Sequence, residues 1–140
     1  MFDLPIRRVM ERKKFITTAP DTPVSQAARL MASKDTGAVL VVEGDQLIGI
    51  FTERDVVFRV IAPGLSPKET LLREVMTSHP KTLDPTQSYG HALVIMQENG
   101  FRHVPVVENG HAIGIISSRN AMDPDLEEFV ADQRRREHYR

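Results

Sequence analysis

A threonine and an aspartate three residues apart are the first side chains in this sequence whose spacing suggests chemistry. Thr52 and Asp55 stand between an apolar run that ends at Phe51 and another that begins at Val56. This pattern predicts a buried strand that turns directly into a helix, with Thr52 as the N-cap residue. The free N–H groups of such a helix start attract phosphate, and a carboxylate accepts hydroxyl protons from a sugar. The same pattern is also an ordinary capping box, and the segment alone leaves that structural alternative open.

The same arrangement recurs later in the chain, with Ser in place of Thr and Asn in place of Asp. Residues 16–55 align with residues 81–120 without a gap. Identical residues in the two copies include Thr17 and Thr82, Pro20 and Pro85, Met31 and Met96, and Gly49 and Gly114. The counterparts of Thr52, Arg54 and Asp55 are Ser117, Arg119 and Asn120. A repeat of this length is typical of supersecondary units that cover each other's apolar faces.

The composition narrows the classes of function. The chain has 140 residues, a formal charge of −1, 26% charged residues and no cysteine. Disulfides, thiolate nucleophiles and cysteine-ligated zinc are therefore excluded, and the charge gives no general attraction to nucleic acid or membrane. The N-terminus lacks the pattern of a signal peptide, and no apolar run is long enough to span a membrane. We expect a cytoplasmic protein.

Hydrophobic periodicity predicts matching elements in the two copies. In the first copy we expect a short strand at 15–18, a helix at 24–34, a strand pair at 38–42 and 46–51, and a helix at 52–61. In the second copy we expect a strand at 82–83, a helix at 88–99, a strand pair at 103–107 and 112–116, and a helix from 117. Asp21 is expected to cap the first long helix, and residues 68–75 to form one or two helical turns.

With both copies in register, the chain resembles tandem CBS (cystathionine β-synthase) domains, which pair into a Bateman module. The shared motifs are an opening Val-Met, a Thr before a turn proline, a strand ending in Val-Val-Glu, and a closing Gly-Ile-x-Thr/Ser-x-x-Asp/Asn. The resemblance implies a first unit at 7–62, a linker at 63–72, a second unit at 73–124 and a C-terminal helical tail at 125–140. It implies an α+β fold of two β-α-β-β-α units. Their three-stranded sheets pack face to face with pseudo-twofold symmetry, and the helices lie outside.

The resemblance also implies a ligand site between the units. In family members that bind adenosine compounds, the residue matching Asp55 binds the ribose hydroxyls, the one matching Thr52 meets phosphate or sugar, and the one matching Ile50 lines the base. Arg54 would lie near the phosphates, and the second unit would contribute Arg102 and His103. The implied ligand is a regulatory adenine nucleotide (AMP, ADP or ATP), with S-adenosylmethionine or NAD as other candidates. No catalytic cofactor and no metal are expected.

A second cleft is expected to be weaker. It would join Ser117, Arg119 and Asn120 with Gly37 and Ala38. An amide hydrogen-bonds a diol more weakly than a carboxylate does, and two small neutral residues replace the basic pair. We therefore expect one good site per chain.

Three functions of different classes are compatible with these residues. The first is a stand-alone ligand-sensing module, a homodimer through its outer helices, that regulates an unidentified effector enzyme or transporter in trans. The second, which is the main alternative, is a dimerisation or scaffolding module that binds no ligand. The third is an enzyme, such as a hydrolase that uses Ser117 or Ser118 with a histidine. The sequence has no nucleophile elbow, no His-Glu metal motif and no Walker loop, so we do not expect an enzyme.

Overall fold

A computed structural model describes residues 3–118 of the chain. The helix expected from Ser117 and the expected tail at 125–140 lie almost wholly outside these residues, as do Arg119 and Asn120. The elements of the first unit are β1 (Thr17–Thr18), α2 (Val24–Lys34), β2 (Ala38–Glu43), β3 (Gln46–Thr52), α3 (Glu53–Asp55) and the π-helical segment η1 (Val56–Ile61). Those of the second unit are α5 (Tyr89–Asn99), β5 (His103–Glu108) and β6 (His111–Ser117). Three further elements precede the two copies, namely α1 (Ile6–Val9), α4 (Leu72–Val75) and β4 (Thr77–Ser78).

Each unit contains an antiparallel hairpin closed by a two-residue turn. β2 pairs with β3 and β5 pairs with β6, and both hairpins contain a bulge at the same place in the repeat. The turn residues have positive φ angles in both units: Gly44 (55°), Asp45 (66°), Asn109 (55°) and Gly110 (82°). Positive φ at both turn positions is the geometry of a type I′ turn, which suits Gly, Asn and Asp. The turn residues therefore fix the register that places the strand ends.

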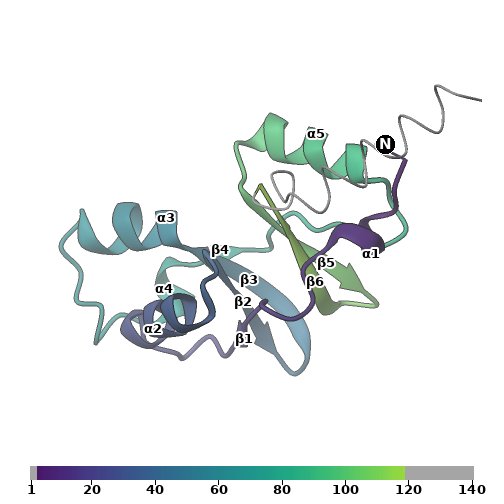
Figure 1. The fold of residues 1–140 in the computed structure, drawn as a ribbon. Coiled ribbons are helices and arrows are strands. Elements are labelled where there is room, and N and C mark those ends of the chain that lie inside the picture. The colour runs from purple at the N-terminus through teal and green to yellow at the C-terminus, as the bar shows by residue number, and fades with distance from the viewer. Residues whose placement is uncertain (1–2, 119–140) are drawn as a thin grey trace, which may run out of the picture.

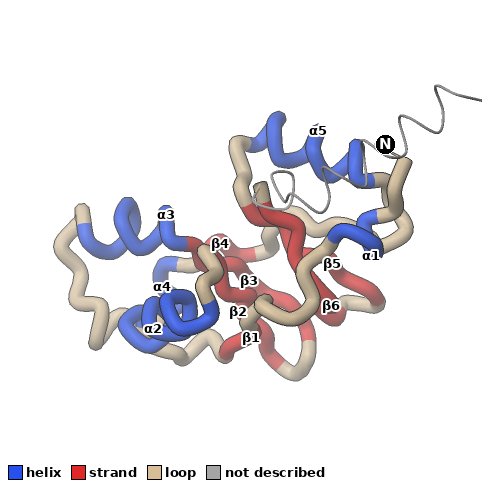
Figure 2. Tube along the Cα trace, viewed as in Figure 1, coloured by secondary structure: helices blue, strands red, loops and turns tan. Residues whose placement is uncertain are grey.

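Alternate residues of each hairpin face opposite layers, because successive side chains of a strand point to opposite faces. Val39 and Val41 pack into a buried cluster with helix α2. Leu40 and Ile50 instead meet Ile115 of the second unit in a separate cluster between the two sheets. The strands therefore lie in the middle of the molecule and the helices outside, as Figure 2 shows. The expected α+β fold of two face-to-face units is confirmed.

The segment that precedes each copy crosses to the other unit. β4 joins the first sheet beside β3, which gives the order β1-β2-β3-β4, four strands where the resemblance implied three. Correspondingly, Glu11 makes a single β-bridge to Ile115 in the second unit. Helix α1, drawn in purple in Figure 1, lies beside β5, β6 and α5, and α4 lies beside α2. Ile6 and Met10 are accordingly buried in the second core, and Leu72 and Val75 in the first.

Three local expectations were wrong in detail. Asp21 does not cap α2: the N-cap is Pro23, which offers no side-chain acceptor, and Asp21 pairs with Arg73 instead. The strand expected at 82–83 is reduced to a single bridge between Leu83 and Val106. The helix expected at 52–61 has the right range, but it widens into a π-helix after Asp55. Within residues 3–118, no helix is long and apolar enough to cross a membrane.

Candidate functional site

The capping box between Thr52 and Asp55 is present in the structure. The backbone N–H of Thr52 donates to Asp55 Oδ2 over 2.9 Å, and the Thr52 hydroxyl donates to the same oxygen over 3.2 Å. The N–H of Asp55 donates back to Thr52 Oγ1 over 3.3 Å. These bonds satisfy N–H groups that a helix start leaves without partners. The structural interpretation of the Thr-x-x-Asp pattern is therefore correct.

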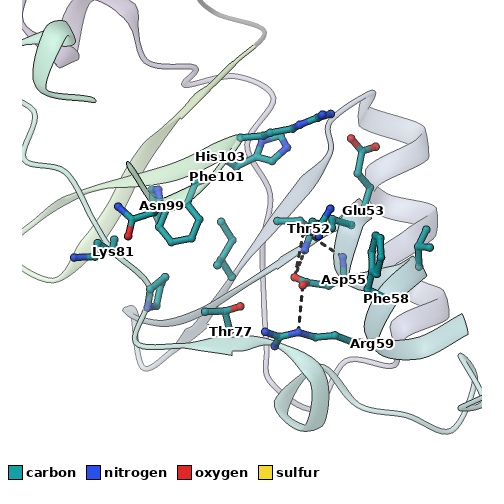
Figure 3. A pocket seen from close by; sticks show the side chains of 17 residues that line it. Thr52, Glu53, Asp55, Phe58, Arg59, Thr77, Lys81, Asn99, Phe101 and His103 are labelled. Atoms are coloured by element: carbon teal, nitrogen blue, oxygen red, sulfur yellow. Dashed lines mark hydrogen bonds and ion pairs between the residues drawn. The ribbon is translucent and has the colours of Figure 1, made fainter. Parts of the chain in front are cut away.

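The same two residues also line a cleft of about 880 Å³ between the units. The first unit contributes the end of β3, α3, η1 and β4, and the second contributes residues 99–103 and Pro105. All six residues that the sequence placed in the stronger site line this cleft, namely Ile50, Thr52, Arg54, Asp55, Arg102 and His103. In Figure 3, Thr52 and Asp55 lie on one side of the cleft, and Phe101 and His103 on the other. The cap and the cleft are thus two features of one strand-to-helix junction.

Backbone geometry explains how the second unit reaches this cleft. Helix α5 ends at Gly100, whose φ of 68° allows the chain to leave the helix sharply. Arg102 and His103 follow at once, where strand β5 begins. The carbonyl of Arg102 accepts a hydrogen bond from the N–H of Ser118 over 2.9 Å, which holds the start of β5 against the end of β6. The two residues are therefore positioned by main-chain contacts.

The Arg54 side chain lies along the helix face. Its Cζ lies 4.2 Å from the centre of the Phe58 ring, one turn further along the helix. A guanidinium over an aromatic face is an attractive cation–π arrangement. Both residues line the cleft, and 58% of Phe58 is exposed. The positively charged guanidinium of Arg54 therefore lies beside the Phe58 ring in the lining of the cleft.

Gly37 lies close to two residues that line the first cleft, Glu53 and His103. A Cβ atom added at Gly37 would come within 2.9 Å of Glu53 Oε1 and 3.0 Å of His103 Nε2. Gly37 and Ala38 were expected to belong to the second cleft, together with Ser117, Arg119 and Asn120. Of these three, only Ser117 is described, and it is half-buried opposite His103 in the β5–β6 pairing. The absence of a side chain at Gly37 therefore leaves space for Glu53 and His103.

Several lining residues were missed by the sequence analysis. Arg59 could have been found, because it lies four residues after Asp55 on the expected helix and its Nε lies 3.5 Å from Asp55 Oδ1. Thr77, Pro80 and Lys81 reach the cleft because β4 joins the first sheet, which no local pattern reveals. Asn99 and Phe101 lie beside the residues that were chosen. Among residues 3–118, no cluster of three His, Asp or Glu side chains could hold a metal ion.

Comparisons with known proteins agree with this architecture. The sequence profile described as "CBS domain" matches residues 6–62 and 72–124. The chain is 33% identical over 129 residues to the meiotically up-regulated gene 70 protein of Schizosaccharomyces pombe, covering 84% of this chain and 18% of that protein. It spans only 18–19% of the length of the first curated relatives it matches.

Two solved structures share the fold. One, from Burkholderia ambifaria MC40-6, is provisionally described as a signal-transduction protein with CBS domains; it has a TM-score of 0.79, 32% identity and coverage of 92% of this chain and 96% of that one. The other is the CBS domain pair of protein MJ0100, solved with 5′-methylthioadenosine and S-adenosyl-L-methionine. Its TM-score is 0.77 at 20% identity, with coverage of 84% of this chain and 92% of that one, so this likeness shows the fold alone.

Proposed function

The chain belongs to the CBS domain family, and on that basis we propose that it is a regulatory module that binds an adenine nucleotide between its two units. The observation that carries the proposal is the convergence of all six residues chosen from the sequence on one cleft of about 880 Å³. A cleft of this size suits a ligand as large as a nucleotide. Occupancy of the cleft would then bias how the module acts on an effector.

The Asp55 carboxylate supplies the ribose contact. Its Oδ2 already accepts two hydrogen bonds from Thr52, whereas Oδ1 lies 3.5 Å from the Nε of Arg59. An ionised carboxylate offers about four acceptor positions, so Oδ1 can still accept hydroxyl protons. The side chain of Asp55 is only 13% exposed, which shields such a bond from water. The capping bonds thus orient the carboxylate for a ribose diol.

The charges of the cleft favour an anionic ligand. Its basic lining residues are Arg54, Arg59, Lys81 and Arg102, with His103 beside them, and its carboxylates are Glu53 and Asp55. Arginine forks bind phosphate oxygens in pairs, and a surplus of positive groups attracts polyphosphates. We therefore favour AMP, ADP or ATP over S-adenosylmethionine, which carries a sulfonium charge.

Apolar lining residues provide room for the base. Ile50 and Pro105 come from opposite units, and Pro80 and Phe101 complete this part of the lining. Apolar walls with a few well-placed polar groups are the usual composition of small-molecule sites. The adenine ring would lie against these residues while the phosphates point toward the arginines.

A thermal-shift panel tests this proposal. AMP, ADP, ATP, S-adenosylmethionine and NAD would be added to the wild type, to Asp55→Asn and to a control, Asp21→Asn, whose carboxylate pairs with Arg73 away from the cleft. A ligand at a hundred times its Kd adds about 2.7 kcal/mol to the free energy of unfolding. We expect an adenine nucleotide to stabilise the wild type and Asp21→Asn, but not Asp55→Asn. Equal stabilisation of all three proteins, or of none, would contradict the proposal.

The outer helical surface favours self-association, and it is also what a scaffolding module without a ligand would need. Val57, Phe58 and Ile61 of η1 and Leu65 of the loop after it are apolar and exposed, with between 44% and 58% of each residue exposed, and Val57 and Phe58 also line the cleft. Neighbouring apolar residues of this kind commonly mark an interface. We propose a homodimer through this surface.

Sedimentation of Ile61→Glu tests the dimer, since Ile61 is 56% exposed and does not line the cleft. The wild type is expected to sediment as a dimer and the variant as a monomer. A monomeric wild type would refute the interface. A dimer without any nucleotide binding would favour the scaffolding function.

A further inference from the structure

We propose that Arg59 is a positioning residue that sets the Asp55 carboxylate for the ribose and links it to the segment around β4, which forms another part of the cleft lining. This inference rests on the proposed nucleotide site and assigns it a residue that the sequence pattern does not include. Arg59 lies in η1, one turn after Asp55, and its side chain is about half exposed. The inference depends on the contacts of the Arg59 side chain and not only on its positive charge.

The guanidinium of Arg59 divides its donors between two parts of the chain. Its Nε lies 3.5 Å from Asp55 Oδ1. Its Nη1 donates to the backbone carbonyls of Val75 over 3.1 Å and Met76 over 3.2 Å. A guanidinium has five N–H donors in a fixed plane, so these contacts fix its orientation, and lysine could not reproduce them. Figure 3 shows the ion pair with Asp55.

The ion pair with Arg59 orients the Asp55 carboxylate through Oδ1, the oxygen that the capping hydrogen bonds do not use. Thr52 holds Oδ2 through two hydrogen bonds, and Arg59 holds Oδ1 through a longer ion pair. With both oxygens restrained, the carboxylate has little freedom to turn. A group oriented before binding loses less entropy when it accepts the ribose hydroxyls. Arg59 is therefore expected to act on the ribose through Asp55.

The carbonyl contacts extend this restraint to the neighbouring strand β4. Val75 and Met76 lead directly into β4, which pairs with Gly49 and Ile50 of β3. Thr77, at the start of β4, lines the cleft, and so do Pro80 and Lys81 just beyond it. Arg59 thus connects the ribose carboxylate to the segment 75–81 through one side chain. We expect an occupied cleft to make this segment more rigid.

Discrimination between ribose and deoxyribose tests the inference directly. ATP and 2′-deoxy-ATP would be titrated calorimetrically into the wild type, Arg59→Met, Arg59→Lys and Asp55→Asn. The wild type is expected to prefer ATP by about tenfold or more, which corresponds to about 1.4 kcal/mol. Arg59→Met and Arg59→Lys should still bind ATP but lose most of that preference, whereas Asp55→Asn should lose most of its affinity for both nucleotides.

The matched control is Arg54→Met, which removes a cleft arginine whose guanidinium stacks on Phe58. It should weaken ATP and 2′-deoxy-ATP equally. Arg59→Met should also abolish the nucleotide-dependent protection of the amides of residues 77–79 and 81 from hydrogen exchange. Arg59→Lys keeps the positive charge, so it tests the contacts even if Arg59→Met folds poorly.

The outcomes separate this inference from the proposed function. If the wild type binds no adenine nucleotide, the proposed site fails and the role of Arg59 fails with it. If the wild type binds through Asp55 but the Arg59 variants keep the ribose preference, only the positioning role is overturned. An equal loss of ATP and 2′-deoxy-ATP binding in Arg59→Met would make Arg59 a phosphate contact instead.

Discussion

At the end of β3 the first unit carries Thr52 and Asp55 on the cleft, whereas the start of its β2 carries the small residues Gly37 and Ala38. The second unit differs at the corresponding place, because Arg102 and His103 stand at the start of its β5. The middle residues of β2 and β5 are buried in both units. The comparison teaches that a duplicated fold can build one charged cleft by exchanging a few residues at strand ends while keeping its core.

The largest difference between the units in the effect of a substitution on stability is expected at Gly49 of β3 and Gly114 of β6. A Cβ at Gly114 would come within 2.9 Å of the backbone oxygen of Glu11, whereas a Cβ at Gly49 would meet only the Met76 side chain. A side chain can move aside, but a paired backbone cannot do so without breaking the bridge. We expect Gly114→Ala to lower the free energy of unfolding by about 2 kcal/mol and Gly49→Ala by about half as much. Urea denaturation would measure the free energy of unfolding of both variants. Equal losses would show that the contact between Met76 and Gly49 and the contact between Glu11 and Gly114 tolerate an added methyl group equally.

The next difference between the two units is at Arg102, whose counterpart in the first copy of the repeat is Gly37. We expect Arg102→Ala to weaken ATP binding about tenfold, which is about 1.4 kcal/mol, and adenosine binding much less, since the lost contact is with phosphate. Calorimetric titration of both ligands would measure this. Arg29→Ala, which removes an exposed arginine of α2 outside the cleft, is the control and should change neither affinity. Equal weakening of adenosine and ATP would place Arg102 away from the phosphates.

The starts of the two long helices differ in their caps. Ser88 accepts a hydrogen bond from the N–H of His91 over 3.2 Å, whereas Pro23, at the start of α2, offers no such acceptor. Ser88→Ala should therefore lower the free energy of unfolding by about 1 kcal/mol. Amide exchange at His91 should become faster in this variant while exchange at the start of α2 does not change. An unchanged His91 amide would show that the cap contributes nothing.

The smallest effect concerns a turn that both units share, closed by the N–H of Thr22 on the Ala19 carbonyl in the first and by the N–H of Gln87 on the Asp84 carbonyl in the second, because only the second has an aspartate there. Hydrogen bonds from the Thr86 hydroxyl (2.6 Å) and the Thr86 backbone N–H (2.8 Å) lower the pKa of Asp84, and the counterpart of Asp84 in the first unit is Ala19. A lowered pKa in the folded state contributes stability above the ordinary pKa, and this contribution is lost as the pH falls through the folded value. Thr86→Val should raise the pKa of Asp84, as followed by NMR titration of its carboxyl carbon. An unchanged pKa would exclude the hydroxyl as the main cause.

The sequence predicted the elements best where local chemistry decides them. The positive-φ residues at Asp45 and Gly110 and the glycine that ends α5 carry clear local signals. The resemblance to the CBS family then implied which strand ends would meet, and the six residues chosen on that basis all line the cleft.

What the sequence could not provide depends on contacts between distant segments. The fourth strand exists because residues 77–78 pair with β3 across the linker, which brings Lys81 into the cleft. The π-helical winding at Val56–Ile61 likewise was not predicted, because the apolar periodicity of this segment is equally compatible with an ordinary α-helix. Asp21 pairs with Arg73 because α4 crosses to the first unit, and so it is not available as a cap.

The most direct test of this account is the number of nucleotides bound per chain. Calorimetric titration of ATP into the wild type and into Asp55→Asn would measure it, with the free energy of unfolding determined for both proteins. The account predicts one ATP per chain in the wild type, and binding that is largely lost in Asp55→Asn although the fold is retained. Two equivalent sites per chain, or binding that Asp55→Asn leaves unchanged, would contradict the assignment of the nucleotide to the cleft that Thr52 and Asp55 line.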